Sequence, residues 1–127
     1  MIDYKEDDSS QTVELTVEGQ VTTGDFDAMA QRLESFVKRH GSIRMLEVIK
    51  DFRGIEPTLF WRDMSFAFRH MRSFSRVAVV TDTTWIKLWT TMVAPFMACE
   101  IEQFGLDEID KARAWLRDKD AQQKKAA

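Results

Sequence analysis

The sequence has too few cysteines and histidines for a disulfide framework or a typical zinc site. Cys99 is the one cysteine among 127 residues, and the two histidines are His40 and His70. A single cysteine cannot close an internal disulfide, and a structural zinc ion needs several such ligands at short spacings. We therefore expect no cofactor, and a cytoplasmic location, where cysteines stay reduced.

An excess of positive charge and a long apolar run are also missing. With 18 basic and 21 acidic residues the net charge is −3, whereas nucleic-acid-binding proteins are usually strongly basic, so we expect no nucleic-acid partner. We expect no signal sequence, and the longest apolar run falls short of the ~20 residues that a transmembrane helix needs. The 44% apolar and 31% charged residues instead indicate a globular, soluble protein.

Strands and helices alternate along the chain. Residues 1–6 and 11–21 predict an antiparallel hairpin, because the second segment alternates apolar and polar residues after a polar turn. Two mostly apolar runs of strand length follow at residues 43–52 and 75–82, and residues 98–104 predict a further strand. Apolar residues at helical spacing predict helices over 24–40, 58–74, 84–97 and from Asp107 to about 117. Thr22 or Thr23 caps the first helix, Gly41 ends it, and Asp107 caps the last.

This order predicts an α/β fold with a mixed sheet of about five strands and about four helices. We expect one domain over residues 1–118, followed by a polar tail over 119–127. Ligands of such sheets bind beyond the carboxyl ends of the strands, where Asp51 and Asp82 fall. Both carboxylates also have a structural interpretation, Asp82 as a helix cap and Asp51 as a turn residue.

Six segments, in this order, resemble the bacterial SpoIIAA-like proteins, which are relatives of the STAS (anti-sigma-factor antagonist) domains. They are GQVTTGDF at 19–26, DFRG at 51–54, LFWRDMSFAFRHM at 59–71, RVAVVTDTTW at 76–85, APF at 94–96 and ARAWL at 112–116. The resemblance extends over about residues 10–117. It implies a STAS-type α/β fold, related in shape to CRAL-TRIO lipid-binding domains, and says more about architecture than about activity.

The chain departs from the regulatory STAS pattern at residues 51–54. In those relatives a serine in an Asp-Ser-Ser-Gly-like turn accepts the phosphate that releases the partner. Asp51 and Gly54 match this turn, but Phe52 and Arg53 replace the hydroxyl residues. The resemblance therefore implies a module without the phosphoserine switch, since neither side chain can accept a phosphate. A helix N-terminus beside Arg53 could instead receive the anionic group of a ligand.

The segment 84–97, TWIKLWTTMVAPFM, has more apolar surface than packing on a sheet requires. Its single charge is Lys87. As a helix it would be apolar over roughly half its circumference, against a stripe of about 100° for core packing. Strand edges, the neighbouring helix or a dimer partner could cover the excess, or it could meet a fatty ligand or a membrane. The candidate residues for an apolar ligand are Trp85, Leu88, Trp89, Met92 and Phe96.

The predicted helix over 58–74 has large apolar residues on its polar side. Leu59 and Phe66 fall there, and Arg62 and Arg69 lie within about one turn of Phe66. An exposed ring among cations suits a protein partner, so these four residues are candidates for partner binding. A basic strip along this side would also include Arg72, Arg76 and Lys87. A solvated charged face is the alternative interpretation.

Three functional hypotheses follow. The first is a non-enzymatic binding or regulatory module that contacts a protein partner, or a second copy, through the predicted second and third helices. The second is a site for an apolar or amphiphilic ligand under the third helix, with Asp51, Arg53 and Asp82 at its polar end and peripheral membrane contact. The third is an enzyme that uses Asp51 and Asp82 as acid and base. We favour the first and predict no catalytic residue.

Overall fold

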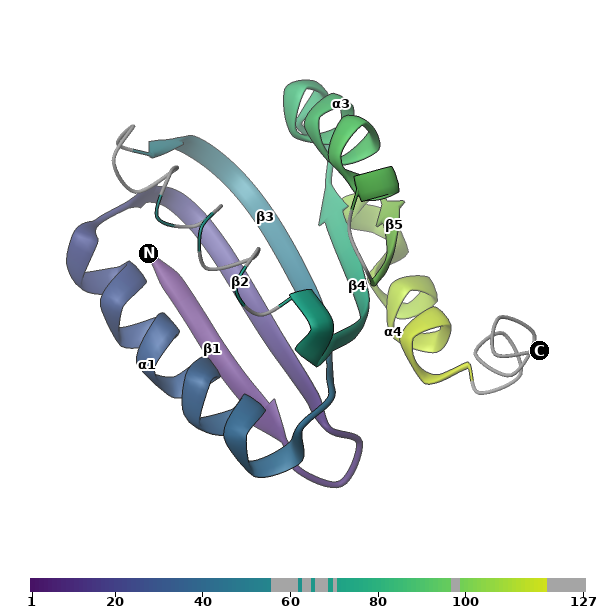
Figure 1. Cartoon of the computed structure of the whole chain (residues 1–127). Helices are drawn as coiled ribbons and strands as arrows, with labels where there is room; N and C mark the ends of the chain where they lie inside the picture. Colours follow the sequence, from purple (N-terminus) through teal and green to yellow (C-terminus); the bar gives the residue numbers. More distant parts are fainter. Residues whose placement is uncertain (56–61, 63–64, 66–68, 70, 97–98, 119–127) are drawn as a thin grey trace.

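The computed structural model describes residues 1–55, 62, 65, 69, 71–96 and 99–118. Its centre is a mixed sheet with the strand order β1-β2-β3-β4-β5 (Figure 1). The strands are β1 (Ile2–Asp7), β2 (Thr12–Val21), β3 (Ile43–Ile55), β4 (Phe74–Thr81) and β5 (Glu100–Phe104). β1 pairs antiparallel with β2, and the other neighbours pair parallel. The predicted five-stranded mixed sheet and its leading hairpin are therefore confirmed.

The described helices follow β2, β4 and β5, and the first two are crossover connections of the kind that parallel strands require. They are α1 (Thr23–His40), α3 (Thr84–Val93) and α4 (Ile109–Arg117), with short 3-10 turns η1 (Met71–Ser73), η2 (Ala94–Phe96) and η3 (Leu106–Glu108). The predicted helix over 58–74 falls mostly outside the described residues, although Arg62, Ser65 and Arg69 are described as helical. The predicted polar tail, 119–127, also lies outside the described residues.

The ends of α1 confirm the predicted caps. Thr22 is the N-cap, and its hydroxyl accepts a hydrogen bond from the backbone N–H of Asp25 at 3.1 Å. The Asp25 carboxylate in turn accepts from the N–H of Thr22 at 3.2 Å, which completes a capping box. At the other end Gly41 has φ of 77°, a conformation that favours glycine, and its N–H donates to the carbonyl of Val37.

Three predicted boundaries are wrong. β3 continues to Ile55 instead of turning at residue 53. α3 ends at Val93, and the chain continues as a 3-10 turn through Pro95, because a proline has no N–H for an α-helical hydrogen bond. Asp107 lies within η3 and does not cap the last helix, whose N-cap position is Glu108.

The sheet has an apolar core on each face. On one face α1 contributes Phe26, Met29, Leu33, Phe36 and Val37, and this core also contains Ile86 of α3. On the opposite face Ala112 and Leu116 of α4 pack on Leu46, Val48, Ala78, Val80 and Phe104. β3 and β4 contribute alternate residues to both cores, so they are covered on both sides. This agrees with their near-continuous apolar sequences.

Arg76 is buried between β4, β5 and α4. It is 1% exposed, so its predicted place in a basic surface strip is wrong. Its Nε donates to the carboxylate of Glu100 at 2.8 Å, and its Nη1 donates to the backbone carbonyl of Trp115. The guanidinium also lies 4.8 Å from the centroid of the Trp115 ring. One residue therefore joins two strands to the last turn of α4, where a cation also complements the helix dipole.

The arginine can be placed by the alternation of β4. Arg76, Ala78 and Val80 share one face of the strand, and the last two lie in the core under α4. The sequence SRVAVVTD therefore contains the signal for an inward-pointing arginine. The sequence does not identify the hydrogen-bond partners of Arg76, because Glu100 and Trp115 are 24 and 39 residues away along the chain.

Replacing Arg76 tests its structural role. We expect Arg76→Ala to lower the free energy of unfolding by about 3–5 kcal/mol, because it leaves the partly buried Glu100 carboxylate and a helix-terminal carbonyl without this partner. Arg72→Ala, at an exposed position of η1, should change this free energy by less than about 0.5 kcal/mol. Urea unfolding followed by circular dichroism measures both. A loss below about 1 kcal/mol for Arg76→Ala would contradict the assignment.

The single tyrosine of the chain, Tyr4, provides a second test of the packing. Its ring is 9% exposed, lies 4.3 Å from the Arg32 guanidinium, and its hydroxyl donates to Glu6 at 3.0 Å. Burial, followed by the hydrogen bond to Glu6, raises the pKa of Tyr4 above its ordinary value of 10.0. The protonated form is thus favoured in the folded state.

Absorbance at 295 nm reports the ionisation of Tyr4 alone. We expect the native protein to titrate well above pH 10.0 and the urea-unfolded protein near it. Because the folded-state pKa is raised, its contribution to stability is complete below the unfolded pKa and is lost as pH rises above 10.0. Coincident native and unfolded titration curves would show that Tyr4 is not packed under α1 in this way.

Candidate functional site

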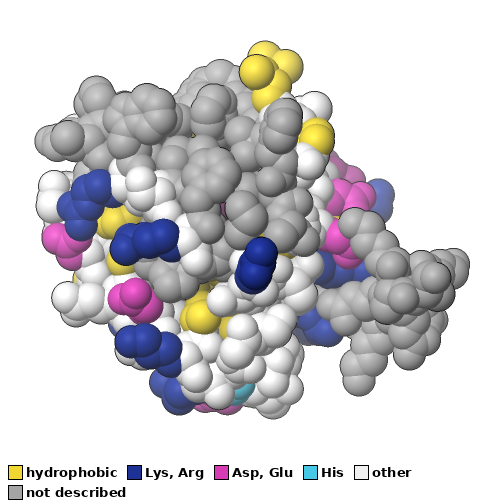
Figure 2. Space-filling view, in the orientation of Figure 1, with side chains coloured by type: hydrophobic (Ala, Val, Ile, Leu, Met, Phe, Trp, Pro, Cys, Tyr) yellow, Lys and Arg dark blue, Asp and Glu magenta, His cyan; other side chains and the backbone are white. Residues whose placement is uncertain are grey.

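α3 exposes apolar side chains on its outward face. Leu88 and Met92, one turn apart, are 62% and 68% exposed, whereas Ile86 is 7% exposed and lies in the core. Among the side chains of α3 and η2 that the structure describes, the exposed ones are Thr84, Leu88, Thr91, Met92 and Pro95. All of these side chains are uncharged. Figure 2 shows hydrophobic side chains projecting from the surface where Figure 1 places α3.

Polar contacts hold α3 against β5. The side-chain amide of Gln103 donates to the backbone carbonyl of Lys87 and to the hydroxyl of Thr91, both at 2.7 Å. Together with the buried Ile86, these bonds fix which side of the helix faces outward. Trp85, Trp89 and Phe96 belong to α3 and η2, but their side chains lie outside the described part of the structure.

Asp51 and Asp82 lie near the same edge of the sheet. The β3–β4 register pairs Ile49 with Thr81, so the two acids follow the paired positions on neighbouring parallel strands. The Asp82 carboxylate accepts a hydrogen bond from the backbone N–H of Leu106 at 3.1 Å. Thr83 is the N-cap of α3, so the expected capping role of Asp82 is wrong. Asp82 instead ties the end of β4 to the start of η3.

Asp51 lies in an irregular part of β3 and not in a turn that follows it. Its φ is 43°, a left-handed conformation that aspartate tolerates better than most residues. Opposite it the β2–β3 register shifts on both sides of Gly19, whose φ is 70°. This bulge bends the end of β3. Arg53 lies in the same strand, and its side chain is outside the described part.

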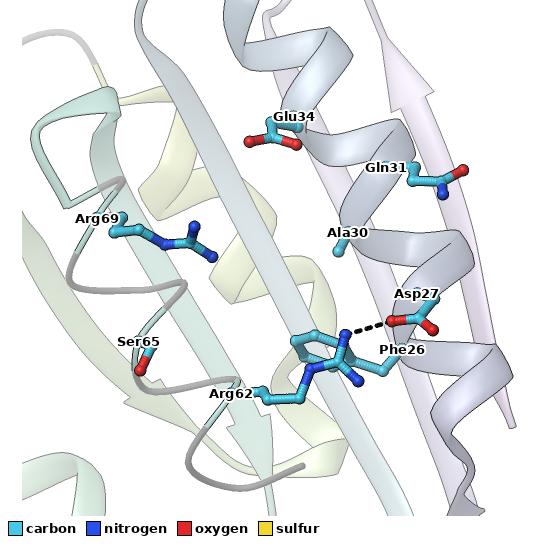
Figure 3. Close-up of a pocket in the computed structure, with 8 residues that line it drawn as sticks. All are labelled: Phe26, Asp27, Ala30, Gln31, Glu34, Arg62, Ser65 and Arg69. Carbon is cyan, nitrogen blue, oxygen red and sulfur yellow. Dashed lines mark hydrogen bonds and ion pairs between the residues drawn. The ribbon is translucent and has the colours of Figure 1, made fainter. Parts of the chain in front are cut away.

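A groove lies between α1 and the helical residues Arg62, Ser65 and Arg69. Its volume is about 450 Å³. It is lined by Phe26, Asp27, Ala30, Gln31, Glu34, Arg62, Ser65 and Arg69 (Figure 3). Arg62 donates to the Asp27 carboxylate, and its guanidinium lies 5.1 Å from the Phe26 ring centroid. Thus Arg62 and Arg69 face α1, whereas the predicted partner-binding residues Leu59 and Phe66 lie outside the described residues.

This groove was not predicted from the sequence, because each helix was considered by itself. The polar residues of α1 that line the groove are Asp27, Gln31 and Glu34. They are spaced by four and three residues and thus share one helix face. That spacing is a usable signal for a polar wall. The groove itself depends on a second helix that meets this wall, and the Arg62–Asp27 pair spans 35 residues.

The sheet order and the placement of helices on both faces define a STAS-like α/β module. The chain belongs to the SpoIIAA-like family, whose sequence model matches residues 12–117, so the predicted family is confirmed. It is similar to a solved structure from Shewanella loihica PV-4, described as an uncharacterized protein of the DUF3478 family with a SpoIIAA-like fold. That protein is 24% identical, with a TM-score of 0.75, over 91% of this chain and 92% of the other.

No curated protein matches this chain. In the described part of the structure, no helix is both long and apolar enough to cross a membrane. The described residues likewise contain no cluster of three or more histidine, cysteine, aspartate or glutamate side chains that could hold a metal ion. Within the described residues, the exposed apolar face of α3 and the polar groove beside α1 are two features that could bind a ligand or a partner.

The role of Asp82 can be measured directly. We expect Asp82→Ala to lower the free energy of unfolding by about 1 kcal/mol, through loss of the hydrogen bond to Leu106, and to speed amide exchange at Leu106. Asp3→Ala, at an exposed position of β1, should affect neither quantity. Denaturant unfolding and hydrogen-exchange NMR measure the two effects. An unchanged exchange rate at Leu106 would argue against a structural role for Asp82.

Proposed function

We propose that this protein is a non-enzymatic regulatory module that binds a protein partner through the outward face of α3. The observation that carries the proposal is the exposure of Leu88 and Met92, at 62% and 68%, on a helix whose other side is anchored in the core. Large apolar side chains four residues apart are the anchors by which a helix docks into an apolar groove of another protein. Methionine adapts its shape to such a groove.

The way α3 is held favours binding. Ile86 and the Gln103 hydrogen bonds keep the helix in one orientation, so a partner meets a surface that is already ordered. Exposed Thr84 and Thr91 border the two apolar anchors with hydroxyl groups, the usual arrangement of an apolar centre within a polar rim. Burial of each anchor would contribute about 1–2 kcal/mol, since both are already partly covered.

A protein partner agrees better with the charges than a membrane surface does. Helices that lie on membranes usually carry several lysines or arginines on the polar face. Lys87 is the one charged residue of α3, and the net charge of the chain is −3, which disfavours attraction to anionic lipid. The apolar-ligand hypothesis also includes Leu88 and Met92, but it depends in part on Trp85, Trp89, Phe96 and Arg53, whose side chains lie outside the described part.

The double variant Leu88→Gln, Met92→Gln tests the proposal. Proteins of the native host that crosslink to a photoreactive residue at position 91 would be identified, purified and titrated against wild type and variant. We expect the double variant to weaken such a complex by at least about tenfold, because both anchors lose their apolar contact. Lys111→Gln with Arg117→Gln, on exposed positions of α4, is the matched control and should bind as wild type.

Two further measurements test whether a second copy of the protein or a membrane binds this face of α3 instead. Sedimentation of the protein alone reports a homodimer, and flotation with phosphatidylglycerol vesicles reports membrane binding. Loss of either association in the Leu88/Met92 double variant would assign the face to that occupant and overturn the proposal of a separate protein partner. Binding of a purified partner that is equal for wild type and double variant would also overturn it.

A further inference from the structure

The groove beside α1 has walls of opposite charge. α1 contributes the carboxylates of Asp27 and Glu34 and the amide of Gln31, whereas the facing wall contributes the guanidinium groups of Arg62 and Arg69. Ala30 and Phe26 lie between the walls and provide an apolar base, as Figure 3 shows. The groove therefore combines a small apolar floor with polar groups of both signs, as small-molecule sites commonly do.

One end of the groove is closed by a pair within the protein. Arg62 donates to Asp27 and stacks over the ring of Phe26 at 5.1 Å. Both members of this ion pair are about half exposed, at 48% and 46%. Because Asp27 already neutralises the charge of Arg62, the Arg62 guanidinium is less available to bind a ligand.

Arg69 differs from Arg62. Its side chain is exposed and lines the groove, and among the described residues it makes neither an ion pair nor a hydrogen bond. Ser65 is four residues earlier, and it also lines this wall of the groove. In Figure 3 the Arg69 side chain points into the space between the two helices. A planar group of five N–H donors in this position matches the two oxygens of a carboxylate.

We propose that this groove binds a small monocarboxylic acid, with its carboxylate on Arg69 and Ser65 and its body over Ala30 toward Gln31. The volume of about 450 Å³ is within the range of small-ligand sites. A singly charged ligand is favoured because Asp27 and Glu34 stand on the facing wall. A phosphate group would bring about two negative charges against these carboxylates.

The experiment uses 4,4,4-trifluorobutanoate as the probe and follows its ¹⁹F NMR signal during titration with the full chain. We expect saturable line broadening with wild type. Arg69→Gln should weaken binding by at least about tenfold, and Ser65→Ala by about threefold, since the first removes charge-assisted hydrogen bonds and the second a neutral one. Arg117→Gln, at an exposed position of α4, is the control and should leave binding unchanged.

Competition separates the ligand classes, and circular dichroism verifies that each variant is folded. Displacement of the probe by acetate and by glycolate, with weaker displacement by inorganic phosphate, would support a monocarboxylate site. Tighter binding of phosphate than of acetate would overturn the proposal. Absence of saturable broadening, or equal broadening with wild type and Arg69→Gln, would overturn it as well. None of these results depends on Leu88 or Met92, so the proposed function is tested separately.

Discussion

The buried guanidinium of Arg76 is the interaction on which the arrangement of the C-terminal half depends. A charge with 1% exposure is tolerated because Glu100 of β5 and the Trp115 carbonyl of α4 both accept its hydrogen bonds. Displacing either element would leave the buried cation without one of these two hydrogen-bond partners. α4 has nine residues and would be unstable alone, so this contact and its packing on the sheet hold it in place.

The described helices are divided between the two faces of the sheet. α4 covers the β3–β5 part of one side of the sheet, where Arg113 also reaches Glu14 of β2 through hydrogen bonds of 2.9 and 3.2 Å. α1 covers the β1–β2 part of the other side. α3 lies near β5 and sends Ile86 into the core of the α1 side. Its outward residues Leu88 and Met92 have no layer above them among the described elements, which is the physical basis for the proposal that they contact a partner.

Three arginines show how one residue type has different structural roles in this protein. Arg76 is enclosed and paired, Arg62 is paired across a groove, and Arg69 is exposed at the same groove. Alternation along β4 indicates that Arg76 points inward, whereas the sequence around Arg62 and Arg69 does not distinguish the paired arginine from the exposed one. The same holds for the carboxylate of Asp82. Its position at the end of a strand suggested a ligand site or a helix cap, whereas in the structure it accepts a hydrogen bond from the backbone N–H of Leu106.

The sequence by itself determined the features that arise from residues close together along the chain. Alternation specified the β1–β2 hairpin, Thr22 and Gly41 specified the ends of α1, and the apolar excess of residues 84–97 specified a helix with more apolar surface than a core requires. Only the tertiary structure decided that Arg76 pairs with Glu100, that Arg62 pairs with Asp27, and that Asp82 binds Leu106. Each of these contacts joins residues at least 24 positions apart, and such pairs leave no periodic pattern in the sequence because their meeting depends on how whole elements pack.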